Sequence, residues 1–165
     1  MLGLLLESPR HGFAVARELT SGSQLGSVWT MPRALVYRAL EELQHSGLAI
    51  EGKRQAGNRG PNRVIFQVTD AGERRFREWL SEPVPHLREL RTELMLKLAF
   101  HARLGLDPGL LLTRQMEVLV PLAAALGRRA RRATGFEATL AWWRYQSALT
   151  ARRFTKGLLD KATRP

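Results

Sequence analysis

The side chains best suited to recognising another molecule gather in two stretches, the first of which is residues 32–46. The outward face of this predicted helix mixes small, aromatic and charged side chains: Ala34, Tyr37, Arg38, Glu41 and His45. The candidates for DNA contact are Arg33, Ala34, Tyr37 and Arg38. Arginine offers a two-pronged donor to a guanine edge or a phosphate, and tyrosine offers a phosphate hydrogen bond or packing against thymine. The pattern therefore predicts contact with DNA. The alternative is an ordinary solvated face, on which Arg38 pairs with Glu41 or Glu42.

The second stretch is the tip of a predicted β-hairpin, where no acidic residue occurs between Glu51 and Asp70. Its cations are Lys53, Arg54, Arg59 and Arg63. A basic finger of this kind suits contact with phosphates or with the minor groove. A solvated loop is the alternative, but the unbroken basic run favours phosphate contact.

Two adjacent tryptophans, Trp142 and Trp143, stand in a predicted helix near the C-terminus. Neighbouring side chains on a helix point about 100° apart, so the two cannot both face one core. We expect one to be packed and the other to lie at a dimer interface or to line an effector pocket, since flat aromatic ligands favour such residues. Packing alone is the alternative.

A second feature of this half is the basic run at residues 127–132, Gly-Arg-Arg-Ala-Arg-Arg. We interpret it as the polar side and C-terminal end of a helix, where cations complement the helix dipole. The alternatives are additional contacts with a DNA backbone or attraction of an anionic effector.

Enzymatic chemistry is not indicated. The four histidines fall on separate predicted elements and form no metal-ligand spacing, and there is no cysteine. No phosphate loop, dinucleotide fingerprint or Gly-x-Ser-x-Gly motif is present. We therefore expect no catalytic residue, no metal site and no cofactor.

The charge favours a polyanionic partner. The 165 residues contain 26 Lys+Arg and 15 Asp+Glu, a net charge of +11, which is typical of proteins that bind nucleic acid. The excess lies mainly in the second half: residues 1–87 carry 11 basic and 9 acidic residues, and residues 88–165 carry 15 and 6. No run approaches the roughly 18 uninterrupted apolar residues of a membrane span. We therefore expect no membrane partner and a cytoplasmic location.

Helices and a hairpin must position the DNA-contacting side chains. Residues 2–6 and 13–19 have the apolar content and spacing of two short helices. In residues 32–46 the apolar positions recur at helical spacing, and Gly47 supplies the C-terminal stop: Val36, Ala39, Leu40 and Leu43. Residues 48–51 begin a strand, residues 57–62 are rich in turn formers, and residues 64–68 alternate as a half-buried strand does. Helix, helix, helix and hairpin are the elements of a winged helix-turn-helix.

The rest of the chain is predicted to be helical. Thr69-Asp70 can cap a helix that ends at Pro83 and Pro85. Three amphipathic helices follow, and the second of them has coiled-coil spacing that Pro121 interrupts, so we expect a kink or two abutting helices there. Because such helices have little contact among themselves, we expect them to pair with a second copy of the chain.

The sequence resembles the PadR family of transcriptional regulators. The resemblance begins with Leu2-Gly3-Leu4-Leu5 and Ser8-Pro9-Arg10-His11-Gly12-Phe13, and continues at Trp29 and at Val36-Tyr37-Arg38-Ala39-Leu40-Glu41-Glu42-Leu43. It closes with Gly47-Leu48, Val68-Thr69-Asp70-Ala71-Gly72 and Trp79-Leu80. It covers residues 2 to 80, and beyond them this chain is similar to longer-armed members only in length and helical character. One departure is Pro32, which stands where family members often have a serine-like cap.

The resemblance implies a homodimer on an inverted-repeat operator, usually repressing, and released when a small molecule binds. We accordingly predict a mainly α fold with a small β-hairpin wing. Residues 1–82 are expected to be the winged helix-turn-helix DNA-binding domain and residues 86–162 a helical dimerisation domain. The predicted partners are double-stranded DNA, a second copy and a small aromatic or other effector. The alternative function is a protein-interaction adaptor that keeps the fold and uses its basic helical arm, without sequence-specific DNA binding.

Overall fold

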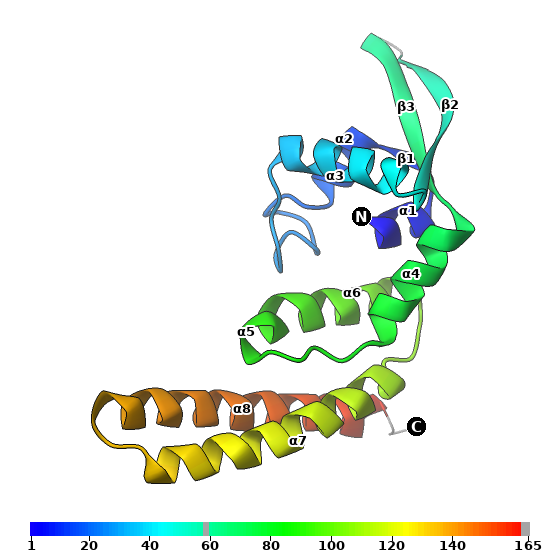
Figure 1. Ribbon diagram of the computed structural model, residues 1–165. Coiled ribbons are helices and arrows are strands. Elements are labelled where there is room, and N and C mark those ends of the chain that lie inside the picture. Colours follow the sequence, from blue (N-terminus) through cyan, green and yellow to red (C-terminus); the bar gives the residue numbers. More distant parts are fainter. Residues whose placement is uncertain (58–59, 163–165) are drawn as a thin grey trace. The chain divides into compact units, whose positions relative to one another are not determined.

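The structure, a computed structural model, describes residues 1–57 and 60–162 (Figure 1). The chain divides into two compact units, Met1–Leu80 and Ser81–Pro165. It is mainly helical with one small antiparallel sheet, so the predicted fold class is confirmed.

The N-terminal unit contains four helices with buried apolar side chains. These helices are α1 (Leu2–Glu7), α2 (Gly12–Arg17), α3 (Arg33–His45) and α4 (Asp70–Ser81). Each contributes apolar side chains that are almost completely buried: Leu4, Leu5, Val15, Val36, Leu40, Phe76 and Leu80. Because α2 and α3 pack against each other through such residues, the opposite face of α3 is left outside the core.

The sheet of this unit has three strands, where the sequence predicts two. They are β1 (Arg10–His11), β2 (Ala49–Gly57) and β3 (Gly60–Val68), in the order β1-β3-β2. Arg10 pairs with Phe66 and His11 with Ile65, so the short segment between the two predicted N-terminal helices contains a strand. Two residues are too short for any alternating pattern to reveal them. Their pairing with β3 decides the conformation.

The hairpin of β2 and β3 also has a shorter tip than predicted. The two strands pair from Ala49 with Val68 as far as Gly57 with Gly60, with register shifts after Glu51 and after Gln55. Residues 60–62, expected in the tip because they are rich in turn formers, therefore belong to β3. Cross-strand pairing overrides their local preference for turns.

Thr69 caps α4 as predicted and also ties it to the end of α3. Its Oγ1 accepts a hydrogen bond from the Gly72 amide at 3.0 Å and donates one to the Gly47 carbonyl at 2.8 Å. Gly72 lies so close to the Leu48 carbonyl that a side chain there would collide with it. The Thr-Asp-Ala-Gly sequence thus brings the start of α4 against the turn that follows α3.

The segment between α2 and α3 is polar at its surface but is held in place from within. Leu25 within it is only 1% exposed, and the Ser23 hydroxyl accepts a hydrogen bond from the Gly26 amide at 2.9 Å. The Met31 amide donates to the Leu19 carbonyl at 3.1 Å. This connection is therefore anchored by one buried leucine and by hydrogen bonds that fix where α3 begins.

The C-terminal unit is entirely helical in the part that the structure describes. Its elements are α5 (Leu87–Glu89), the π-helical turn η1 (Leu90–Leu94), α6 (Met95–Arg103), α7 (Gly109–Arg132) and α8 (Gly135–Ala162). The two long helices α7 and α8 pack along one another (Figure 1). The core contains Val84, Leu90, Leu94, Leu111 and Leu119.

Helix α7 runs without interruption through Pro121, so the predicted alternative of two abutting helices is wrong.

Two buried polar side chains hold the segment that precedes α5. Gln115 of α7 accepts a hydrogen bond from the Val84 amide at 2.7 Å and donates one to the Val84 carbonyl at 2.9 Å. Lys97 of α6, which is 1% exposed, donates to the Glu82 carbonyl at 2.6 Å.

Among the described residues, α7 is the one helix long and apolar enough to cross a membrane by length and composition alone. Its best 18-residue window has a mean hydropathy of 1.4. Arg114, Gln115 and Glu117 interrupt the apolar run, and the buried residues of α7 form one stripe. In this fold that stripe packs within the C-terminal unit.

Candidate nucleic-acid interface

Helix α3 is held by one face and exposed on the other. Val36 and Leu40 are completely buried, and Ala39 and Leu43 are half-buried, as the helical spacing predicts. The helix begins after Pro32, which provides no side-chain cap, and ends before Gly47, whose φ of 67° is in the left-handed region. The predicted DNA-contacting residues Arg33, Ala34 and Arg38 are all exposed.

Tyr37 is half-buried because its ring lies over the start of α2. A β-carbon at position 12 would stand 2.7 Å from Tyr37 Cε1, so Gly12 is what lets the ring approach. The Arg33 guanidinium lies 4.9 Å from the Phe13 ring centroid and 5.6 Å from that of Tyr37. Arg33, Phe13 and Tyr37 therefore form one cluster in which two rings fix the direction of the arginine.

Among the side chains that the structure describes, Arg38 has no ion-pair or hydrogen-bond partner, so the predicted alternative of a pair with Glu41 or Glu42 is wrong. Its guanidinium is free for an outside acceptor.

Sequence reasoning missed two exposed apolar side chains beside these residues, Phe13 at 42% and Leu35 at 49% exposure. The glycine-aromatic pair at positions 12 and 13 was the available signal for Phe13.

The wing residues are described only in part. The backbone of Lys53, Arg54 and Arg63 lies in β2 and β3, and Arg54 pairs with Val64. The side chains of these three residues, and the whole of Arg59, lie outside the described residues. Their predicted contact with phosphates therefore stays a prediction.

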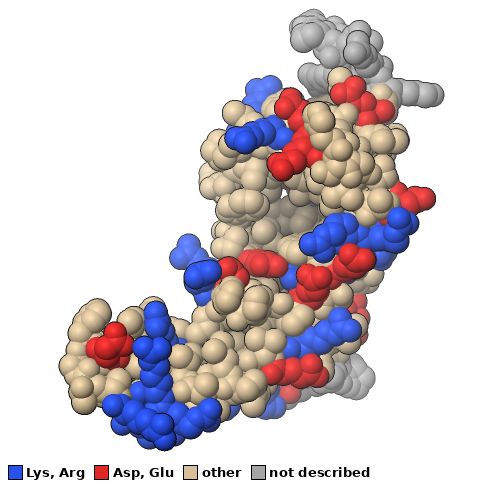
Figure 2. All heavy atoms as spheres, viewed as in Figure 1, with Lys and Arg blue, Asp and Glu red and all other residues tan. Residues whose placement is uncertain are grey.

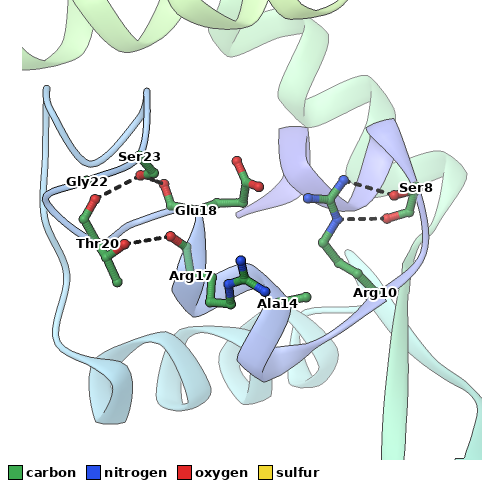
Figure 3. Close-up of a pocket in the computed structure, with 8 residues that line it drawn as sticks. All are labelled: Ser8, Arg10, Ala14, Arg17, Glu18, Thr20, Gly22 and Ser23. Atoms are coloured by element: carbon green, nitrogen blue, oxygen red, sulfur yellow. Dashed lines mark hydrogen bonds between the residues drawn. The ribbon is translucent and has the colours of Figure 1, made fainter.

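The N-terminal unit has a hollow of about 670 Å³ beside α2 (Figure 3). Its polar groups are largely bonded to one another. The Thr20 hydroxyl donates to the Arg17 carbonyl at 2.8 Å, and Arg10 bonds both Ser8 and the carboxylate of Glu7. Glu18 also lines the hollow (Figure 3). With Glu18 beside Arg10 and Arg17 in its wall, the hollow carries both signs of charge.

Positive charge is densest in the C-terminal unit. Figure 2 shows Lys and Arg gathered over the C-terminal end of α7, whereas the visible face of the N-terminal unit carries both signs. Residues 128, 129, 131 and 132 are arginines in the last turns of α7, and all four are exposed. The interpretation of this run as the C-terminal end of a helix is confirmed.

Trp142 and Trp143 are both exposed, at 56% and 69%, so the prediction that one of them packs in a core is wrong for the single chain. The buried face of α8 is made instead by the small residues Ala141, Ala148 and Thr155. These side chains let α7 approach closely and leave both indoles outside. Trp142 contacts Tyr145, with ring centroids 5.8 Å apart.

Comparison with known families gives a match to the "Transcriptional regulator PadR-like family" over residues 1–78. These residues include α1, α2, α3, the sheet and most of α4. We refer to residues 1–78 as the PadR-like domain after this match. The resemblance read from the sequence motifs is thereby confirmed, and the family is one of regulators, in line with the prediction that the chain is not an enzyme.

The PadR-like domain and the C-terminal unit together are similar to several solved structures. Bacillus subtilis PadR in complex with operator DNA is 19% identical, with 98% of this chain and 91% of that chain covered and a TM-score of 0.48. The PadR-like transcriptional regulator BC1756 from Bacillus cereus is 18% identical, with 98% and 92% covered and a TM-score of 0.43. The Vibrio cholerae virulence activator AphA is 15% identical, with 98% and 92% covered and a TM-score of 0.40. The search of curated proteins found no match.

Proposed function

We propose that this protein is a homodimeric, cytoplasmic transcriptional repressor that binds an inverted-repeat operator and is released by a small-molecule effector. The observation that carries the proposal is the exposed face of α3 in a PadR-like domain, where Arg33 and Arg38 form no ion pair with any described side chain and Tyr37 stands between them. We assign DNA binding to residues 1–82 and dimerisation to residues 86–162.

The DNA contacts follow from the positions on α3. Arg33, Tyr37 and Arg38 lie within two turns of the N-terminal end of the helix, which is the end that usually reads base edges in a helix-turn-helix protein. Ala34 stands on the same exposed face, where a small side chain allows close approach to a base or sugar. Lys53, Arg54, Arg59 and Arg63 of the wing supply phosphate contacts.

The dimer follows from a stripe on α8 whose large apolar side chains stay largely exposed in the part of the chain that the structure describes. It consists of Phe136, Leu140, Trp143, Ser147, Thr150 and Phe154, which share one side of the helix at steps of three or four residues and include no charge. Phe136, Trp143 and Phe154 are 78%, 69% and 45% exposed. A second copy is the occupant we assign, because a two-fold axis would set this α8 stripe against its own equivalent and bury all the rings at once.

The test is binding of the full chain to DNA from upstream of its own gene, measured by fluorescence anisotropy against random duplex over a range of salt concentrations. We expect tighter binding to the upstream DNA, and loss of that preference in Tyr37→Ala with Arg38→Ala. Equal affinity for both duplexes, unchanged in the variant, would favour the adaptor function instead. A reporter gene under the same upstream DNA decides the sign of regulation, since a repressor lowers its expression.

A further inference from the structure

A groove of about 310 Å³ runs between the second half of α7 and the middle of α8. Its floor is apolar: Ala123, Ala124 and Gly127 come from α7, and Tyr145 and Leu149 from α8. A β-carbon at Gly127 would stand 3.0 Å from Tyr145 Cε2, so the absence of a side chain there lets the ring lie against the backbone of α7. The groove therefore has an apolar floor, and the ring of Tyr145 forms one of its walls.

Three arginines surround this floor, Arg128 and Arg131 from α7 and Arg152 from α8. None of them has an ion-pair or hydrogen-bond partner in the part of the chain that the structure describes. Nearby Arg129 behaves differently, because it pairs with Glu137 at 3.2 Å. Three unpaired guanidinium groups around one groove repel one another, and an anion placed between them would relieve that repulsion. Guanidinium forks bind carboxylate, sulfonate or phosphate oxygens in pairs.

We propose that this groove binds an organic anion with an apolar body, and that such an anion is the effector of the regulator. Cations alone would suit a nucleic-acid backbone equally well. A row of phosphates has no use for an apolar floor and an aromatic wall, whereas a small amphipathic anion uses both. The volume also lies at the low end of small-molecule sites. The binding site stands on the groove itself, and its role as an effector site rests on the proposed function.

The groove and the α8 stripe lie on different flanks of the helix pair. At about 100° per residue, Tyr145, Leu149 and Arg152 fall on the side of α8 opposite Phe136, Trp143 and Phe154. A dimer formed through the stripe therefore leaves the groove open. The two tryptophans divide in the same way: Trp142 flanks the groove through its contact with Tyr145, and Trp143 belongs to the stripe.

The test is isothermal titration calorimetry of the full chain with naphthoate and with its neutral analogue naphthamide. We expect naphthoate to bind and naphthamide, which has the same apolar body without the charge, to bind at least about tenfold more weakly. In an NMR spectrum the indole N–H signal of Trp142, assigned with Trp142→Phe, should move on titration, while that of Trp143 stays. Equal binding of the two probes, or no binding of either, would overturn the proposal.

Matched variants locate the site. Arg131→Gln with Arg152→Gln should weaken naphthoate binding about tenfold or more, because each loses a charged fork. Arg91→Gln with Arg153→Gln removes the same charge from exposed positions of this unit outside the groove and should leave affinity within about twofold. Ala124→Phe keeps every charge but fills the floor, so it should also abolish binding. Equal losses in both double variants, with Ala124→Phe unaffected, would mean general attraction to a basic surface and overturn the groove as a site.

Failure of this proposal can be told apart from failure of the proposed function. Operator affinity is measured in the same variants without naphthoate, where we expect no change from groove substitutions. The groove double variant could lose DNA affinity while naphthoate fails to weaken the DNA binding of the unaltered protein. That pair of results would assign the arginines to the DNA backbone and overturn the effector role. If even the unaltered protein shows no operator preference while naphthoate still binds, the regulator function fails and the binding site stands.

Discussion

The ring of Tyr37 lies against the backbone of Gly12, where a β-carbon at position 12 would stand only 2.7 Å from Tyr37 Cε1. This contact joins the start of α2 to the exposed face of α3, and Arg33 is placed over the same ring. The direction of two proposed DNA-contacting side chains therefore depends on the absence of a side chain at one residue of the neighbouring helix.

Gly12→Ala should accordingly lower both stability and operator affinity. The added methyl group overpacks the contact, for which a cost of about 1–3 kcal/mol in the free energy of unfolding is usual. Gly22→Ala is the control, since nothing lies within 4 Å of a β-carbon there. Urea denaturation and anisotropy titrations measure the two effects. Indistinguishable variants would show that the ring moves aside at no cost.

Replacing Arg33 and Arg38 by Gln should change the salt dependence of DNA binding. Each phosphate contact that is lost lowers the slope of log affinity against log salt by about 1. A lost base contact instead relaxes the preference for the operator over other DNA. Arg74→Gln, an exposed position on α4, serves as the charge control. An unchanged slope together with unchanged preference would remove both arginines from the interface.

Thr69→Ala should destabilise the N-terminal unit by about 1 kcal/mol, which is the usual worth of a helix cap. The variant loses the bond from the Gly72 amide and the bond to the Gly47 carbonyl. Thr69→Ser keeps the hydroxyl and should stay close to the original stability. Thermal unfolding followed by circular dichroism distinguishes the two. A Ser variant as unstable as the Ala variant would point to the methyl group as the stabilising part.

Gln115→Leu should destabilise the C-terminal unit by about 1–3 kcal/mol, because it leaves the amide and carbonyl of Val84 buried without partners. Gln146→Leu provides the comparison, since that side chain makes no hydrogen bond among the described residues and should change stability by less than about 0.5 kcal/mol. Denaturant unfolding of both variants is the measurement. Equal stabilities would show that Val84 finds water as an alternative partner.

Trp143→Glu with Phe154→Glu should turn the proposed dimer into a monomer. Both side chains are exposed in the single chain, so the folded protomer should survive, and its circular dichroism checks this. Trp142→Glu changes an equally exposed neighbour on the other flank of α8 and should leave the dimer intact. Sedimentation velocity gives the mass of each variant. A dimer that persists in the double variant would place the interface elsewhere.

The sequence alone determined the features that depend on neighbouring residues. The apolar spacing of α3, its stop at Gly47 and the cap at Thr69 were all predicted, because helical period, left-handed glycine and capping hydroxyl act over a few residues. The motifs of residues 2 to 80 indicated the PadR-like family for the same reason. They are local strings that occur in a fixed order.

Tertiary structure decided what depends on residues far apart in the chain. The pairing of Arg10 and His11 with β3 and the place of Gly12 under Tyr37 join segments that no local pattern connects. Small residues on the buried side of α8 leave both indoles exposed, and the packing of α7 on α8 brings Arg152 beside Arg131. Spacing within one helix states which residues share a face. Only the packing of a second element determines whether that face is covered or left open.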